Sequence, residues 1–201
     1  MISPDFFAEV PALLLRDPLA GALGAAADGL IEYQYADAVR LAGHSCPTVA
    51  GAWLMTRRAL AALYPREVPE RGGMRIELRD GEGIGVTGVV GNVIALITGA
   101  AGEGGFPGLN GRFSRRGLLR HGVTMSGEVR FSRLDNGASL ELTYHPETVP
   151  PDPGLPPLMH KVLAGDATVD ERKQFGRLWQ ARVRRILIEH ADDPALVRVL
   201  P

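Results

Sequence analysis

The sequence predicts an α+β fold in which a small antiparallel sheet packs against helices and a long helix lies near the C-terminus. Three observations lead to this class. Met74 to Arg79 alternates apolar and charged residues, as a half-buried strand does. Asp135-Asn136-Gly137 separates two apolar stretches and is a strong hairpin signal. Thr168 and Glu171 have the spacing of a capping box at the start of a long amphipathic segment.

The composition is that of one globular domain. The chain has 201 residues, 45% of them hydrophobic, and its 22 basic and 23 acidic side chains leave a net charge of -1. A nearly neutral chain lacks the broad positive field of a nucleic-acid-binding protein, so nucleic acid is not an expected partner. No apolar run approaches the ~20 residues that cross a bilayer, and the first residues lack the pattern of a secretory signal. We therefore expect a cytoplasmic protein without a membrane partner.

Several helices are predicted in the first half of the chain. Pro11 to Arg40 is rich in Ala and Leu but interrupted by turn residues, which predicts two or three short helices, the best of them over Tyr33 to Leu41. A longer helix is predicted over Pro47 to Leu63, since proline fits its first turn and an apolar stripe follows. Val86 to Thr98 is almost wholly apolar, and its length favours a helix over a buried strand. The glycine-rich stretch from Gly99 to Gly108 predicts a flexible loop.

The second half contains the hairpin and the long helix. Glu128 to Leu134 and Ser139 to Tyr144 are its two predicted strands. Pro146 to Pro157 is rich in proline and predicts a semi-rigid spacer. The helix that starts after Thr168 should extend to about His190. We accordingly divide the chain into an α+β core over residues 1–150 and an arm over residues 151–201, whose helix packs on the core or on a dimer partner.

The motif that carries chemistry is Gly43-His44-Ser45-Cys46-Pro47, which contains the only cysteine of the chain. Cys46 directly precedes a predicted helix, whose macrodipole favours a negative sulfur. A thiolate beside an imidazole either binds a soft or borderline metal or becomes an activated nucleophile. The sequence therefore indicates a site at His44 and Cys46 without choosing its reaction.

His44 and Cys46 supply two metal ligands, whereas a tetrahedral metal requires four. The others would come from a second subunit, from water, or from side chains elsewhere in the chain: Asp37, Glu103, His121 or His145. We also expect Asp37 or a backbone carbonyl to orient the His44 ring, because Asp37 lies on a helical line that leads to it. Zinc suits the mixed sulfur and nitrogen donors best, with nickel, iron and haem iron as alternatives.

The glycine loop is expected to approach this site. Backbone without side chains can come close to a ligand, so Gly102, Glu103 and Gly104 are the candidate cofactor contacts. The loop lacks the Gly-Lys-Ser/Thr ending of a P-loop, which disfavours nucleotide binding. Four arginines beyond the loop either form a solvated basic face or hold an anion: Arg112, Arg115, Arg116 and Arg120.

The stretch from Leu41 to Gly51 resembles the Gly-His-x-Cys-Pro signature of the FmdE family, which takes its name from a component of formylmethanofuran dehydrogenase. Asn92 to Ala100 looks like the second block of that family, so the likeness covers roughly Tyr33 to Leu119. The resemblance implies an α+β core, a metal site that includes His44 and Cys46, and intertwined dimers.

This chain departs from the FmdE pattern at two positions and at its end. Asn92 occupies a position where the family commonly carries Asp, and Ala100 one where it commonly carries Cys. The C-terminal zinc finger of some members is missing, because it would require further cysteines. These departures remove groups that the family commonly carries and leave the first block intact.

Three functions remain open from the sequence. The first is a metal-binding protein, with an open coordination position at which a small molecule is sensed or altered. The second is a metal-free thiol enzyme, with Cys46 as the catalytic nucleophile and His44 as the base. The third is a non-catalytic interaction or sensor protein whose long C-terminal helix makes an interface. We expect a homodimer, with a small molecule as the candidate ligand.

Overall fold

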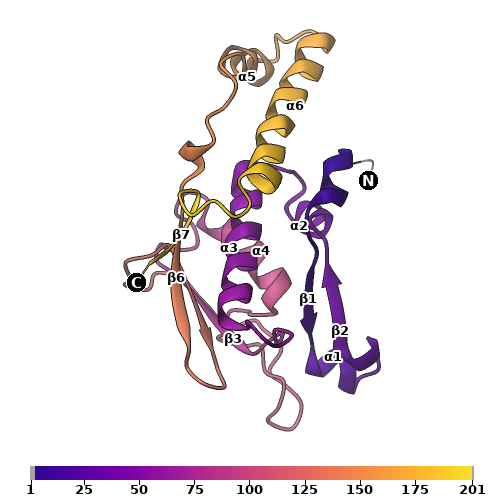
Figure 1. The fold of residues 1–201 in the computed structure, drawn as a ribbon, viewed down its shortest axis with the longest axis vertical. Helices are drawn as coiled ribbons and strands as arrows, with labels where there is room; N and C mark the ends of the chain where they lie inside the picture. Colours follow the sequence, from indigo (N-terminus) through magenta and orange to yellow (C-terminus); the bar gives the residue numbers. More distant parts are fainter. Residues whose placement is uncertain (1–2, 201) are drawn as a thin grey trace.

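The structure is a computed structural model that describes residues 3–200, and its architecture is α+β, as predicted (Figure 1). The strands are β1 (Leu13–Arg16), β2 (Leu30–Tyr33), β3 (Met74–Leu78), β4 (Leu119–Arg120), β5 (Val129–Arg133), β6 (Ser139–Tyr144) and β7 (Val197–Leu200). The main sheet has the order β4-β3-β5-β6-β7 and is antiparallel except between β3 and β4. Strands β1 and β2 form a separate antiparallel ribbon.

The helices are α1 (Pro18–Ala22), α2 (Tyr35–Ala42), α3 (Pro47–Leu63), α4 (Thr87–Thr98), α5 (Leu155–Ala164) and α6 (Val169–Arg184), with 3-10 segments at Asp5–Glu9, Ala27–Gly29 and Pro146–Thr148 and a π segment at Arg185–Glu189. Helices α3 and α4 lie between the main sheet and the ribbon, whereas α5 and α6 project away from them (Figure 1). Helix α3 is central, since it contacts α4, β6 and β7, and the ribbon lies on its other side (Figure 1). None of the described helices combines the length and apolar character needed to span a bilayer.

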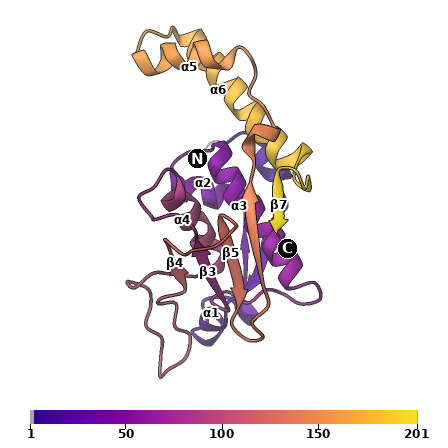
Figure 2. The ribbon, with the colours of Figure 1, turned by 90° about the vertical axis from the view of Figure 1, so that its left-hand side faces the viewer.

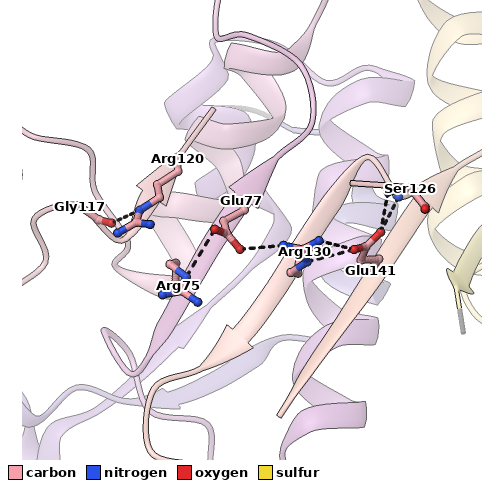
Figure 3. A network of polar contacts seen from close by, with 8 residues as sticks. Arg75, Glu77, Gly117, Arg120, Ser126, Arg130 and Glu141 are labelled. Atoms are coloured by element: carbon pink, nitrogen blue, oxygen red, sulfur yellow. Dashed lines mark hydrogen bonds and ion pairs between the residues drawn. The ribbon is translucent and has the colours of Figure 1, made fainter. Parts of the chain in front are cut away.

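The main sheet has one buried apolar face and one polar face. The side chains on the buried face include Met74, Ile76, Leu78, Phe131 and Leu142. On the other face, Arg130 of β5 makes ion pairs with Glu77 at 3.4 Å and with Glu141 at 2.6 Å (Figure 3). This alternation follows from the two-residue period of a strand and confirms the half-buried strand predicted from Met74 onward.

The predicted hairpin is present between β5 and β6. Ser132 pairs with Ser139, which leaves a short loop that contains Asp135-Asn136-Gly137. Gly137 has a positive φ of 73°, a conformation that glycine adopts without strain. The side chain of Asn136 instead accepts a hydrogen bond from the Ala138 amide at 2.9 Å. The two turn residues therefore act differently, Gly137 through its backbone and Asn136 through its side chain.

The first third of the chain departs from the prediction of helices alone. Helices α1 and α2 are present, but strand β1 precedes α1 and strand β2 lies between α1 and α2. The two strands pair with each other. Helix α2 begins at Tyr35 because Tyr33 belongs to β2, where it pairs with Leu13. Leu13 and Leu15 are buried while Leu14 and Arg16 are exposed. Three consecutive leucines concealed this two-residue period in the sequence.

The C-terminal arm is a helical hairpin of α5 and α6 that extends beyond the core (Figure 2). The predicted capping box between Thr168 and Glu171 begins α6. Helix α5 begins within the last three residues of the predicted spacer, because its two prolines occupy the first turn, where proline is tolerated. After α6 the chain returns to the core: Ile186 and Leu187 are fully buried, and β7 pairs with β6. Only the tip of the predicted arm is therefore separate from the core.

Candidate functional site

Cys46 occupies the predicted position at the start of α3. It is the N-cap residue, and its sulfur accepts a hydrogen bond from the Val49 amide at 3.5 Å. Pro47 follows at the first helical position, where no backbone donor is required. The thiol is free and only 8% exposed. The sulfur therefore lies at the positive end of the helix macrodipole, in a mostly enclosed position.

Two tyrosines border Cys46. The Tyr35 hydroxyl and the Ser45 hydroxyl lie 3.0 Å apart, and the Tyr144 hydroxyl donates to the Pro47 carbonyl at 2.8 Å. Burial raises the pKa of both tyrosines above the usual value, and the charge that the Cys46 sulfur would carry raises it further. Both phenols are therefore neutral near pH 7, and the Tyr144 hydroxyl serves as a hydrogen-bond donor.

Helix α6 holds the backbone of the motif. Trp179 Nε1 and Gln180 Nε2 both donate to the Ser45 carbonyl, at 3.0 Å and 3.1 Å. This carbonyl belongs to the peptide that joins Ser45 to Cys46. The C-terminal arm is therefore coupled directly to the motif, a contact for which the sequence contains no local signal.

His44 is exposed, and its tautomer is defined by one hydrogen bond. Its Nδ1 lies 2.9 Å from the Ala42 carbonyl, which can only accept, so Nδ1 carries the proton and Nε2 has a free lone pair in the neutral ring. A backbone carbonyl thus orients the ring, and Asp37 does not. The Asp37 carboxylate accepts from the Gln34 amide at 2.9 Å and from Arg40 at 2.6 Å, as the third residue of the α2 capping box.

A cavity of about 200 Å³ lies beside His44. It is lined by residues of α2, α4 and the motif: Leu41, Ala42, His44, Val89, Asn92 and Val93. Cys46 is not among them, and within residues 3–200 no hydrogen bond joins it to His44. The imidazole that a thiol enzyme would use as its base therefore makes no hydrogen bond to the sulfur in this conformation.

The candidate cofactor residues lie elsewhere. The Gly102 carbonyl accepts from the Gly105 amide at 2.9 Å and from the Gly117 amide at 3.2 Å, so the glycine loop is held against the segment that leads to β4. Glu103 is exposed, and Gly104 has open space around it. These loop residues do not line the cavity beside His44, because the loop follows the end of α4, whereas the α4 residues that line the cavity lie earlier in that helix.

Beyond His44 and Cys46, the described part of the chain offers no further metal ligand at the motif. Residues 3–200 contain no group of three or more His, Cys, Asp or Glu side chains that could hold a metal ion. Both ring nitrogens of His145 are engaged by neighbouring side chains. The ring of His121 is packed against Gly91 of α4. A metal at this motif would therefore find its remaining ligands outside residues 3–200.

Comparisons with protein-family models, with curated proteins and with solved structures find no match to this chain. The resemblance to the FmdE family therefore depends on the motif residues alone and stays a prediction. The site consists of an imidazole with Nε2 available, a sulfur that caps a helix, and two neutral phenols that are hydrogen-bonded to the residues on either side of Cys46.

Proposed function

We propose that this protein binds a divalent transition metal, preferably zinc, through His44 and Cys46. The supporting observation is the hydrogen bond from His44 Nδ1 to the Ala42 carbonyl. Metal-binding histidines commonly anchor one ring nitrogen on a carbonyl or carboxylate and coordinate through the other. Here the remaining Nε2 belongs to an exposed ring. Cys46 adds a sulfur at a helix N-terminus, where an anionic ligand is stabilised.

We propose further that two copies of the chain share the metal. Structural zinc is four-coordinate, and one chain offers two of the four ligands. A second copy would contribute the same pair and complete a set of two histidines and two cysteines. The exposure of His44 supports this arrangement, since a partner copy can approach the ring directly. A metal with an open position would instead polarise a small ligand.

Metal analysis of protein purified without a histidine tag tests the proposal. We expect about one zinc per two chains in the unmodified protein, because four ligands are needed. His44→Ala should lose the metal. His160→Ala is the matched control, because His160 is an exposed histidine on α5, and it should retain zinc. No zinc in the unmodified protein, or full zinc in His44→Ala, would contradict the proposal.

Light scattering with and without a chelator tests the sharing. If two copies hold one metal, EDTA should convert the dimer into monomers or raise its dissociation constant. A monomer that binds one zinc per chain would instead favour an open site completed by water or a small ligand. That result would retain the metal and reject the shared site.

A further inference from the structure

A second site is indicated where the ribbon meets the loop after α4, because two arginines there share one carboxylate. Asp17 is 3% exposed, and its carboxylate accepts from Arg71 at 2.8 Å and from Arg115 at 2.7 Å. Asp17 also caps α1 through the Leu19 and Ala20 amides. Arginine stays charged in proteins. The three side chains therefore carry one positive charge in excess.

Arg115 has donors that nothing in the described chain uses. Its side chain is 8% exposed, and both its Nε and its Nη1 are buried without a hydrogen-bond partner. Gly72 makes room for this guanidinium, since a Cβ atom there would lie 1.4 Å from Nη1. Gly99 packs against the same group, with its Cβ position 3.0 Å from Nη1. A buried guanidinium with unused donors is costly unless an anion completes it.

A cavity of about 430 Å³ adjoins this pair of arginines. Arg71, Arg112 and Arg115 line it, together with Ser114 and Glu70. Within residues 3–200, Arg112 makes no ion pair, and its guanidinium lies 4.9 Å from the centre of the Phe113 ring. Its charge is therefore available to a ligand.

The loop that carries Arg112 has a strained backbone. Phe113 has a φ of 64°, in the left-handed region that a bulky side chain disfavours, whereas Asn110, with a φ of 47°, adopts this region more readily. Such strain is frequent at ligand sites. The strain at Phe113 thus lies next to Arg112, which makes no ion pair within the described residues.

We propose that this cavity binds a small organic acid through its carboxylate. The three arginines face two carboxylates, Asp17 and Glu70, which leaves one positive charge for a monoanion. Arginine forks match the planar geometry of a carboxylate. A neighbouring cavity of about 540 Å³ shares Glu70, Gly72 and Leu134 with this one and extends past Tyr64 and Val68. The body of the acid would lie there.

Benzoate, benzamide and inorganic phosphate, each at constant ionic strength, are suitable probes. We expect benzoate to shift the amide NMR signals of residues 112–115 and to saturate, while benzamide, of the same shape without the charge, does not. Equal binding of benzoate and benzamide, or no binding of benzoate, would overturn the proposal. Tighter binding of phosphate than of benzoate would overturn the assignment to a carboxylate.

The matched variants are Arg112→Gln and Arg116→Gln. Both arginines are exposed, but only Arg112 lines the cavity. Loss of one charged hydrogen-bond donor should weaken benzoate binding about tenfold or more in Arg112→Gln, and Arg116→Gln should bind as the unmodified protein does. His44→Ala should also bind benzoate normally, because this site is separate from the proposed metal site. Unchanged affinity in Arg112→Gln would contradict the proposal.

Discussion

The ring of Tyr144 occupies the space that a side chain at Gly51 would need: a Cβ atom there would lie 2.4 Å from Tyr144 Cε1. The hydroxyl of the same tyrosine donates to the Pro47 carbonyl at 2.8 Å. Strand β6 is therefore seated against the first turns of α3, directly beside Cys46. The position of the sulfur depends on this contact between helix and sheet.

Gly51→Ala should destabilise the fold. Alanine usually stabilises a helix interior by about 1 kcal/mol relative to glycine, but here the new methyl group meets the Tyr144 ring. Overpacking of this kind costs about 1–3 kcal/mol in the free energy of unfolding, which urea denaturation measures. Gly176→Ala is the control, because this position in α6 has open space around it. It should gain about 0.5–1 kcal/mol. A stabilised Gly51→Ala variant would show that the ring lies elsewhere.

Asp17→Asn should be among the most damaging single changes. The substitution keeps the size of the side chain but leaves Arg71 and Arg115 without their shared counter-charge. Removal of one member of a buried ion pair costs about 3–5 kcal/mol, measurable by chemical denaturation. Asp192→Asn removes a carboxylate that is 78% exposed and paired with Arg57, and should change the stability little. Equal effects of the two changes would argue against a buried cluster.

Acid should destabilise the protein partly through Asp17. Burial alone would raise the pKa of this carboxyl, but hydrogen bonds from Arg71 and the Ala20 amide and the charges of both arginines hold it below its usual value. A lowered pKa in the folded state gives stability that is full above the unfolded pKa of about 4 and is lost as the pH falls through the folded value. Denaturation between pH 6 and 3 should therefore show a steeper loss in the unmodified protein than in Asp17→Asn. Parallel curves would contradict this role.

Thr168→Ala should loosen the start of α6 while Thr168→Ser should not. The threonine hydroxyl accepts from the Glu171 amide at 3.2 Å, and the Glu171 carboxylate accepts from the Thr168 amide at 2.8 Å. Loss of the cap costs about 1 kcal/mol, and serine can replace it. Hydrogen exchange at the first turns of α6 would detect the difference. If both variants exchange alike, the capping box does not form in solution.

Local signals in the sequence predicted the elements that they encode. The start of α3, the capping box of α6 and the hairpin around Gly137 are each specified by a few adjacent residues, and all three are present. The ribbon was missed because the apolar run in β1 has no visible alternation. Strand β7 was missed because its place depends on pairing with β6, a distant segment.

The site was predictable only in part. The position of Cys46 at a helix N-terminus follows from the proline after it. The hydrogen bond from Tyr144 to the Pro47 carbonyl could not be predicted, since the two residues are 97 positions apart in the chain. Asp17 and Arg115, which are joined by a hydrogen bond, are likewise 98 positions apart in the chain. Contacts of this kind are created by the tertiary fold and leave no pattern in the sequence.

Cys46→Ser tests the central claim most directly. Serine is a strong N-cap, so it should keep the hydrogen bond to the Val49 amide and the start of α3, but it removes the sulfur ligand. We predict that untagged Cys46→Ser unfolds at the same temperature as the metal-free unmodified protein and contains only background zinc. A Cys46→Ser variant that retains the zinc content of the unmodified protein would contradict the assignment of Cys46 as a metal ligand.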